Sequence, residues 1–129
     1  MATAVPKASS IPAGRVLIVD DDDVVRVTTQ AALNGRGYDT VAVSSGAEAL
    51  AYLARDTPAL MLLDLNMDDM NGWEVITMVR SEPRLANVEV VVVTGSDAAV
   101  APPTRVLRKP FKVEALLETL GQPNRRRSA

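Results

Sequence analysis

The chain has 129 residues, of which 47% are hydrophobic and 23% charged, which is the size and composition of one ordinary globular domain. It contains no cysteine and no histidine. This excludes disulfide scaffolds, thiolate or histidine-ligated metal sites, and nucleophilic catalysis by cysteine or by a serine–histidine pair. Any acid–base or metal chemistry must therefore come from carboxylates, lysine, hydroxyls and the backbone.

The net charge of −2 is unevenly distributed along the chain. Residues 1–14 carry +1 from Lys7 and residues 124–129 carry +3 from three arginines, which leaves −6 for residues 15–123. An acidic body is not typical of a nucleic-acid-binding protein. No apolar run approaches the roughly 18 residues of a membrane span, and the N-terminus lacks the apolar core of a signal peptide. We therefore expect a cytoplasmic protein with no nucleic-acid partner and no membrane insertion.

The first half of the chain predicts alternating strands and helices. Residues 15–20 (RVLIVD) are a continuous apolar run that stops at acids, which is typical of a strand buried on both faces. Apolar residues at helical spacing (Val24, Val27 and Ala31), followed by two glycines, predict a helix over 22–36. The next elements predicted are a strand over 38–43, a helix after residue 45 and a strand over 59–64.

Capping and spacing signals predict the remaining helices. Ser45 stands three residues ahead of Glu48, the capping-box spacing that starts a helix. Two alternative apolar stripes predict a third helix over 73–80. A closing amphipathic helix is predicted over 112–120, because four apolar residues there follow the i, i+3, i+4, i+7 pattern. Between these helices the chain predicts a strand over 88–94 and a short one over 105–107.

The predicted order, β-α-β-α-β-α-β-loop-β-α, indicates an α/β fold with one doubly wound parallel sheet. The predicted organisation is a disordered leader over 1–14, a folded domain over 15–121 and a basic tail over 122–129. In such sheets the functional site lies at the carboxyl ends of the strands, beside the topological switch point. The residues predicted at those ends are Asp20, Asp21, Asp64, Thr94 and Lys109.

Each of these residues has a structural explanation when taken alone. An aspartate after a strand often caps the next helix, and a threonine is an ordinary strand residue. Together they are more specific, because three carboxylates at one sheet edge repel one another and need a counter-charge. Lys109 supplies one positive charge, and Mg²⁺ could supply the rest through oxygen ligands. A carboxylate oxygen there could attack phosphorus, with Thr94 donating to the attached group, so the set fits aspartyl phosphorylation.

Four separated segments strongly resemble the receiver domain of two-component response regulators. They occur in the family's order and are VLIVDDD (16–22), LLDLNMDDMNGWE (62–74), VVVVTG (90–95) and RKPF (108–111). The resemblance covers residues 15–120. It implies a flavodoxin-like, five-stranded parallel sheet in the order 2-1-3-4-5.

The resemblance also implies a phosphoacceptor and a metal site. Asp64 would take a phosphoryl group from a histidine kinase or a histidine phosphotransfer protein. Mg²⁺ would be held by Asp21, by Asp64 and by the backbone carbonyl of Asn66, and Asp20 would act through a bound water.

Two further residues receive roles from the resemblance. Thr94 would be the switch hydroxyl that moves toward the phosphoryl group, and Lys109 would contact a phosphoryl oxygen, with a cis bond joining it to Pro110. A receiver of this kind is not an enzyme with a separate substrate, although it supports its own phosphoryl transfer and dephosphorylation.

The sequence departs from the family pattern at several positions. Val106 occupies the place of the usual aromatic switch residue, and Asp68 replaces a common proline. The segment 95–108 is short and contains Pro102 and Pro103, so we expect the fourth helix to be shortened or missing. Such a domain should dimerise poorly through the face that the family forms from its fourth helix, fifth strand and fifth helix. We therefore expect a monomer that meets partners through its first helix and site loops, either as a stand-alone receiver or as part of a hybrid histidine kinase.

Two other functions stay open at this stage. A phosphatase with an aspartyl nucleophile uses a similar residue set, but Asn66 cannot act as the proton donor that such an enzyme places two residues after its nucleophile. A phosphorylation-independent pseudo-receiver, a binding module only, is kept open by Val106 and by the short 95–108 segment.

Overall fold

The sheet has five parallel strands in the order β2-β1-β3-β4-β5, which confirms the predicted fold class. The computed structural model describes residues 14–67, 72–95, 105–109 and 111–121. The strands are β1 (Arg15–Val19), β2 (Asp39–Val43), β3 (Leu60–Asp64), β4 (Glu89–Thr94) and β5 (Arg105–Arg108). The helices are α1 (Asp23–Asn34), α2 (Gly46–Leu53), α3 (Gly72–Ser81) and α4 (Val113–Gly121), with a 3₁₀ turn over Pro83–Leu85. Each strand and α-helix lies within a residue or two of its predicted position, whereas the 3₁₀ turn has no counterpart among the predictions.

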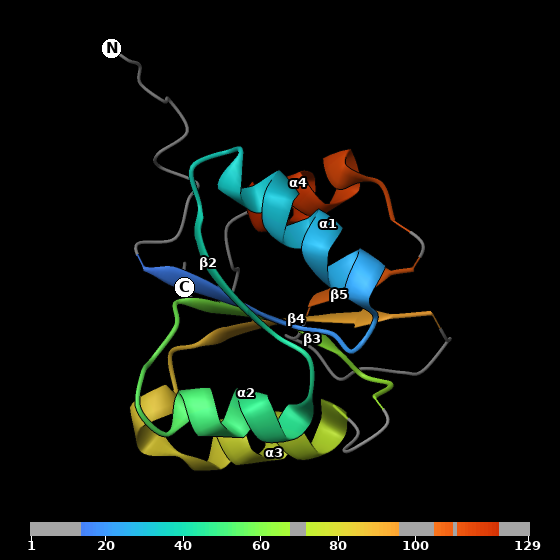
Figure 1. Ribbon diagram of the computed structural model, residues 1–129. Coiled ribbons are helices and arrows are strands. Elements are labelled where there is room, and N and C mark those ends of the chain that lie inside the picture. Colours follow the sequence, from blue (N-terminus) through green and yellow to red (C-terminus); the bar gives the residue numbers. More distant parts are fainter. Residues whose placement is uncertain (1–13, 68–71, 96–104, 110, 122–129) are drawn as a thin grey trace.

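The helices cover both faces of the sheet, with α1 and α4 on one side and α2 and α3 on the other (Figure 1). Side chains alternate along each strand, so each face contributes its own buried cluster. Leu17 and Met61 belong to the cluster under α2 and α3, whereas Ile18 and Leu62 belong to the one under α1 and α4. Apart from polar residues at their ends, the three central strands, β1, β3 and β4, are apolar because both of their faces are covered.

The buried face of α1 differs from the stripe that predicts the helix. Thr29 and Leu33 are buried, whereas Val24 and Val27 are 74% and 61% exposed. The helix itself is confirmed, because its N-cap Asp22 accepts a hydrogen bond from the backbone N–H of Val25 at 3.0 Å. The apolar spacing therefore indicates the right structure but lies on the solvent-facing side.

The predicted cap of α2 is present in a modified form. The hydroxyl of Ser45 accepts from the backbone N–H of Glu48 at 3.0 Å, as a capping box requires. In return, Glu48 Oε1 accepts from the backbone N–H of Ser44 at 2.8 Å, one residue earlier than the usual partner.

The amino edge of the sheet, opposite the predicted site, is closed by a polar network. Arg15 Nε lies 3.1 Å from Asp39 and Arg15 Nη1 lies 3.3 Å from Asp56, so one guanidinium joins β1, β2 and the chain after α2. The Tyr52 hydroxyl donates to Asp56 at 3.1 Å. Arg84, from the 3₁₀ turn, donates to Thr57 Oγ1 at 2.7 Å and adds a further element to this edge.

Several predictions fall on residues that the structure does not describe. These are the leader apart from Gly14, the reduced fourth helix expected within 96–104, Asp68, the bond to Pro110, and the tail over 122–129. Within the described ranges, none of the helices has the length and apolar character needed to cross a bilayer.

Burial of Leu116 predicts a stability difference within α4. Leu116 is fully buried against the sheet, whereas its neighbour Leu117 is only partly buried. We expect Leu116→Ala to lower the free energy of unfolding by about 2–5 kcal/mol, because the residue leaves a cavity, and Leu117→Ala to cost clearly less. Urea denaturation followed by far-UV circular dichroism measures both, and equal costs would contradict this packing of α4.

Candidate functional site

Residues that follow three different strands meet at the carboxyl edge of the sheet. Asp20 directly follows β1, Asp64 is the last residue of β3, and Lys109 directly follows β5. Carboxylate oxygens of Asp20, Asp21 and Asp64 lie within 4.8 Å of one another. Asp20 and Asp64 are each 4% exposed, and Asp21 is the more open of the three. The parallel sheet thus brings together acids that are more than forty residues apart in sequence.

The ammonium of Lys109 is the counter-charge for two of these acids. Its Nζ lies 3.0 Å from Asp20 Oδ2 and 3.3 Å from Asp64 Oδ2. The backbone N–H of Lys109 donates to the carbonyl of Thr94 at 2.8 Å, which ties the end of β5 to the end of β4. Lys109 therefore connects the ends of β4 and β5 to Asp20, after β1, and to Asp64, at the end of β3.

Burial shifts the protonation equilibria of this pair. The pKa of Asp64 is raised, chiefly because burial disfavours its charged form, and the charge of Asp20 adds to the effect. The backbone N–H of Asn66, which donates to Asp64 Oδ1 at 3.0 Å, and the Lys109 ammonium act in the opposite direction. For Lys109, burial would lower the pKa, but its contacts with Asp20 and Asp64 outweigh burial and raise it.

The donor set fits a hard divalent cation. Three carboxylates and one ammonium leave two negative charges without compensation by these four groups. All of the candidate ligands are oxygens, which Mg²⁺ prefers. Both carboxylate oxygens of Asp20 already have partners, since the N–H of Asp22 donates to Oδ1 at 2.9 Å and Lys109 contacts Oδ2. Both oxygens of Asp64 likewise have partners, the Asn66 N–H and Lys109, so Asp21, the most open of the three acids, is the carboxylate best placed for direct ligation.

Thr94 and Val106 lie on the two strands that complete this edge. Thr94 is the last residue of β4, has no exposed surface, and is in register with Arg108 of β5. Val106 is 40% exposed, whereas its neighbour Leu107 is buried on the opposite face. The structure thus places all six predicted site residues at one edge: four by side-chain proximity, Asn66 through its N–H and Thr94 through its carbonyl.

Gly72, the first residue of α3, is a site feature that the sequence reasoning did not single out. Its N–H donates to the carbonyl of Leu65 at 2.9 Å. A Cβ at this position would lie 2.7 Å from the carbonyl oxygen of Asp64 and 2.8 Å from the Cα of Leu65. Glycine therefore lets α3 begin against the peptide that carries Asp64. The available signal was the place of Gly72 within the segment 62–74 that carries the family resemblance.

We expect Gly72→Ala to destabilise the protein by about 1–3 kcal/mol, because the added methyl group must displace backbone rather than a side chain. Gly35→Ala is the matched control, since a Cβ there meets nothing closer than 3.3 Å. Urea denaturation measures the cost, and amide chemical shifts of Asp64 and Asn66 report the displacement. A Gly72→Ala variant as stable as Gly35→Ala, with unmoved shifts, would contradict the close approach.

The raised pKa of Asp64 predicts that Asp64→Asn is more stable than the natural protein at pH 7 without Mg²⁺. A carboxyl whose pKa is raised on folding stabilises the folded state below its unfolded pKa, about 3.9. That contribution is lost as the pH rises through the folded value. At neutral pH the ionised, buried carboxylate therefore costs stability, and an amide removes the cost.

Asp56→Asn is the control of opposite sign. The pKa of Asp56 is lowered, first by the hydrogen bond from the N–H of Thr57 and then by that from Tyr52, so this carboxylate stabilises the fold above its unfolded pKa and its amide should lose stability at pH 7. Denaturation midpoints at pH 7 and at about pH 3 separate the two cases. A destabilised Asp64→Asn at pH 7 would show that the Lys109 contact outweighs burial.

Comparison with known proteins identifies the family of this chain. A family model described as the response regulator receiver domain matches residues 16–121. The response regulator MprA of Mycobacterium leprae is 34% identical over 110 residues, which cover 80% of this chain and 47% of that protein. The chain thus spans about half the length of the first curated relatives that it matches.

Two further similarities come from Vibrio cholerae. The CAI-1 autoinducer sensor kinase/phosphatase CqsS is 30% identical over 95 residues, which cover 73% of this chain and 14% of that protein. The solved structure of the chemotaxis response regulator CheY4 superposes with a TM-score of 0.77 at 29% identity, covering 83% of this chain and 95% of that one.

Proposed function

The chain belongs to the response regulator receiver domain family of two-component systems, and from this premise we propose that it is an active phosphoacceptor whose Asp64 is phosphorylated in a Mg²⁺-dependent reaction. The phosphoryl donor is a histidine kinase or a histidine phosphotransfer protein, and the aspartyl phosphate changes the affinity for a partner. One observation carries the proposal: Asp20, Asp21 and Asp64 meet within 4.8 Å beside the Lys109 ammonium.

Asp64 acts as the nucleophile. One of its carboxylate oxygens forms a bond to phosphorus while the phosphorus–nitrogen bond of the donor phosphohistidine breaks, and the electron pair of that bond leaves with the imidazole. The N–H of Asn66, 3.0 Å from Oδ1, orients the carboxylate. It also favours the ionised form that the attack requires, against the effect of burial.

Lys109 acts as the electrostatic partner of the transferred group. Its ammonium lies between the carboxylates of Asp20 and Asp64, 3.0 and 3.3 Å away, and so stands beside the reacting oxygen. Phosphorylation replaces one carboxylate with a group of higher negative charge, and the ammonium then donates to a phosphoryl oxygen. The bond from its N–H to the Thr94 carbonyl keeps the lysine aimed at this edge.

Asp21, Asp64 and the backbone carbonyl of Asn66 would hold Mg²⁺, and Asp20 would contribute through a water. When bound, Mg²⁺ neutralises part of the charge that accumulates on the phosphoryl oxygens and the carboxylates. Direct ligation by Asp20 would displace the Asp22 N–H or the Lys109 ammonium, and direct ligation by Asp64 would likewise displace the Asn66 N–H or Lys109.

The response to phosphorylation runs through Thr94, whose hydroxyl turns toward the phosphoryl group. The next step differs from the family pattern, because Val106 has no aromatic ring to follow the threonine and is 40% exposed. We therefore propose that the phosphorylated state is read by partners at the site loops and α1 rather than through an aromatic side chain on β5.

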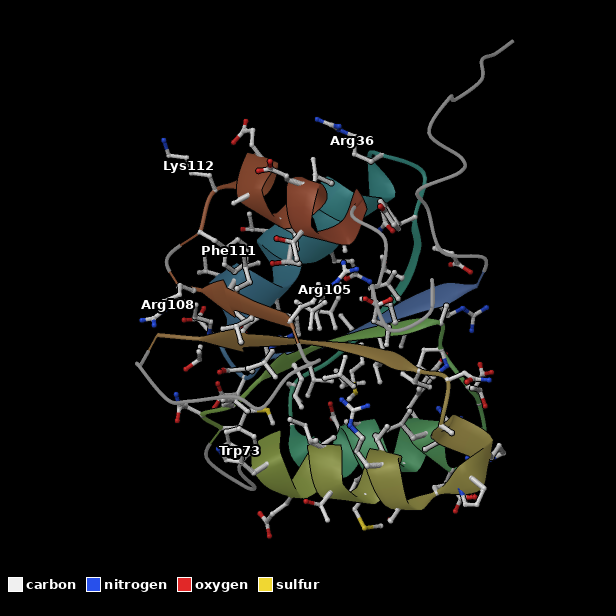
Figure 2. All side chains as sticks on the ribbon, turned by 180° about the vertical axis from the view of Figure 1, so that it is seen from behind. Arg36, Trp73, Arg105, Arg108, Phe111 and Lys112 are labelled. Carbon is white, nitrogen blue, oxygen red and sulfur yellow. The ribbon has the colours of Figure 1, made fainter. Side chains whose placement is uncertain are left out.

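The partner surface that we propose lies beside the site. A groove of about 440 Å³ opens between α1 and the start of α4, lined by Val24, Val25, Thr28, Thr29, Lys109, Phe111 and Leu116. Figure 2 shows Phe111 between these elements, near the end of β5. Val24 and Val27 add exposed apolar area on α1. An apolar helix face next to Lys109 suits a helix that presents its phosphohistidine to Asp64.

The context of the domain is also part of the proposal. Its relatives include a response regulator and a sensor kinase/phosphatase, both longer than this chain. We propose that the domain acts in the cytoplasm as a monomer, alone or within a hybrid kinase. We expect no nucleic-acid contact through residues 15–123, which carry −6.

Phosphorylation by acetyl phosphate and Mg²⁺ tests the proposed function. We expect intact-mass spectrometry to show one added phosphoryl group on the natural protein, none on Asp64→Asn, and none after EDTA treatment. Asp56→Asn is the matched control and should be phosphorylated normally, because Asp56 belongs to the opposite edge of the sheet.

Three outcomes would contradict the proposal in different ways. A natural protein that neither gains mass nor binds Mg²⁺ would favour the phosphorylation-independent pseudo-receiver. Repeated release of phosphate from a simple phosphate ester would favour the aspartyl phosphatase instead. Phosphorylation that leaves the affinity for every kinase or phosphotransfer partner unchanged would show that the modification switches nothing.

A further inference from the structure

Arg26 reaches back from the first turn of α1 to the acidic turn at the site. Its Nη1 donates to the backbone carbonyl of Asp20 at 2.9 Å, and its Nη2 donates to Asp23 Oδ1 at 2.6 Å. The Arg26 side chain is only 18% exposed, whereas that of Asp23 is 83% exposed. The guanidinium is therefore largely withdrawn from water and points inward, toward the backbone of a proposed site residue.

This contact completes the anchoring of Asp20. Its N–H donates to the carbonyl of Val43 at 3.2 Å, and its carbonyl accepts from Arg26. Its Oδ1 accepts from the Asp22 N–H at 2.9 Å, and its Oδ2 lies 3.0 Å from Lys109 Nζ. Every polar group of Asp20 thus has a partner, and Arg26 is the one that holds the carbonyl.

The carbonyl of Asp20 belongs to the peptide plane that leads to Asp21. Because that plane is rigid, fixing its oxygen also fixes the N–H and the Cα of Asp21, and with them the direction in which the Asp21 carboxylate leaves the chain. A displaced plane would move this carboxylate relative to Asp64, which is part of the neighbouring strand.

We infer that Arg26 is a positioning residue for the divalent-cation site, holding the Asp20–Asp21 peptide so that the acidic side chains converge. The inference rests on the proposed function, since it concerns the same site. A nearby positive charge weakens cation binding by Coulomb repulsion, so charge alone gives Arg26 the opposite effect. A lysine cannot substitute, because the planar guanidinium holds two acceptors at once.

Loss of Arg26 should strengthen Mg²⁺ binding if only its charge matters and weaken it if the residue positions the site, so a Mg²⁺ titration is decisive. Binding is followed by calorimetry and by the fluorescence of Trp73, the only tryptophan, which Figure 2 shows on the same side of the molecule as Arg108 of β5. We expect Arg26→Met to raise the dissociation constant for Mg²⁺ about tenfold, as loss of a residue that orients metal ligands typically does. Arg26→Lys should also weaken binding although it keeps the charge.

Arg36→Met is the matched control. Arg36 lies just beyond the other end of α1 and projects away from the sheet (Figure 2), so its loss removes the same charge without touching the acidic turn. We expect its dissociation constant to stay within about twofold of the natural value.

Phosphorylation by acetyl phosphate gives a second readout, which a general loss of stability would not produce. The Arg26 variants should need about tenfold more Mg²⁺ for half-maximal rate, while the rate at saturating Mg²⁺ approaches that of the natural protein. Should Arg26→Met fail to fold, Arg26→Lys carries the same test, because it keeps the charge.

Two results separate this inference from the proposed function. If the natural protein binds Mg²⁺ and is phosphorylated, but the Arg26 variants bind Mg²⁺ as tightly as Arg36→Met or more tightly, the positioning role is wrong and the proposed function stands. If the natural protein itself neither binds Mg²⁺ nor gains a phosphoryl group, the proposed function fails and the inference fails with it.

Discussion

Repulsion among carboxylates is the constraint on which this structure depends. A parallel sheet directs the carboxyl ends of its strands to one edge, so the acids at the ends of β1 and β3 lie close together. The Lys109 ammonium relieves this repulsion for Asp20 and Asp64 by reaching across from the end of β5. The carboxyl edge is therefore stabilised by a cation that follows β5, the last strand of the sheet. Any group that binds Lys109 or the acids changes the charge balance of this edge.

The sequence predicts the fold well because its strands are unusually explicit. Continuous apolar runs such as 16–19 and 90–93 indicate strands buried on both faces, and the structure confirms them. Their acidic and polar endings also predict which residues gather at the carboxyl edge. What the pattern cannot determine is which face of α1 is buried. Val24 and Val27 have the right spacing, yet Thr29 and Leu33 face the core, because the choice depends on packing against β2 and α4.

The residues that sequence reasoning missed share one property: each lies against the backbone of a site residue. Gly72 matters because of the distance between its missing Cβ and the Asp64 carbonyl. Arg26 matters because its guanidinium turns inward to the Asp20 carbonyl rather than outward to solvent. An arginine seven residues after a strand and a glycine at the start of a helix are common, so only the three-dimensional structure separates these two from ordinary surface and capping residues.

The two edges of the sheet are built on opposite principles. At the amino edge, the partly exposed Arg15 pairs with Asp39 and Asp56, whose charges stay in contact with water. At the carboxyl edge, Asp20 and Asp64 are buried and share the ammonium of Lys109. We therefore expect resistance to local opening to decrease along the strands, from the amino edge to the carboxyl edge, where the carboxylates repel one another. Such a gradient confines rearrangement to the carboxyl edge and leaves the amino edge fixed as a hinge. A change of charge at a single carboxylate can then move the carboxyl edge without loosening the domain.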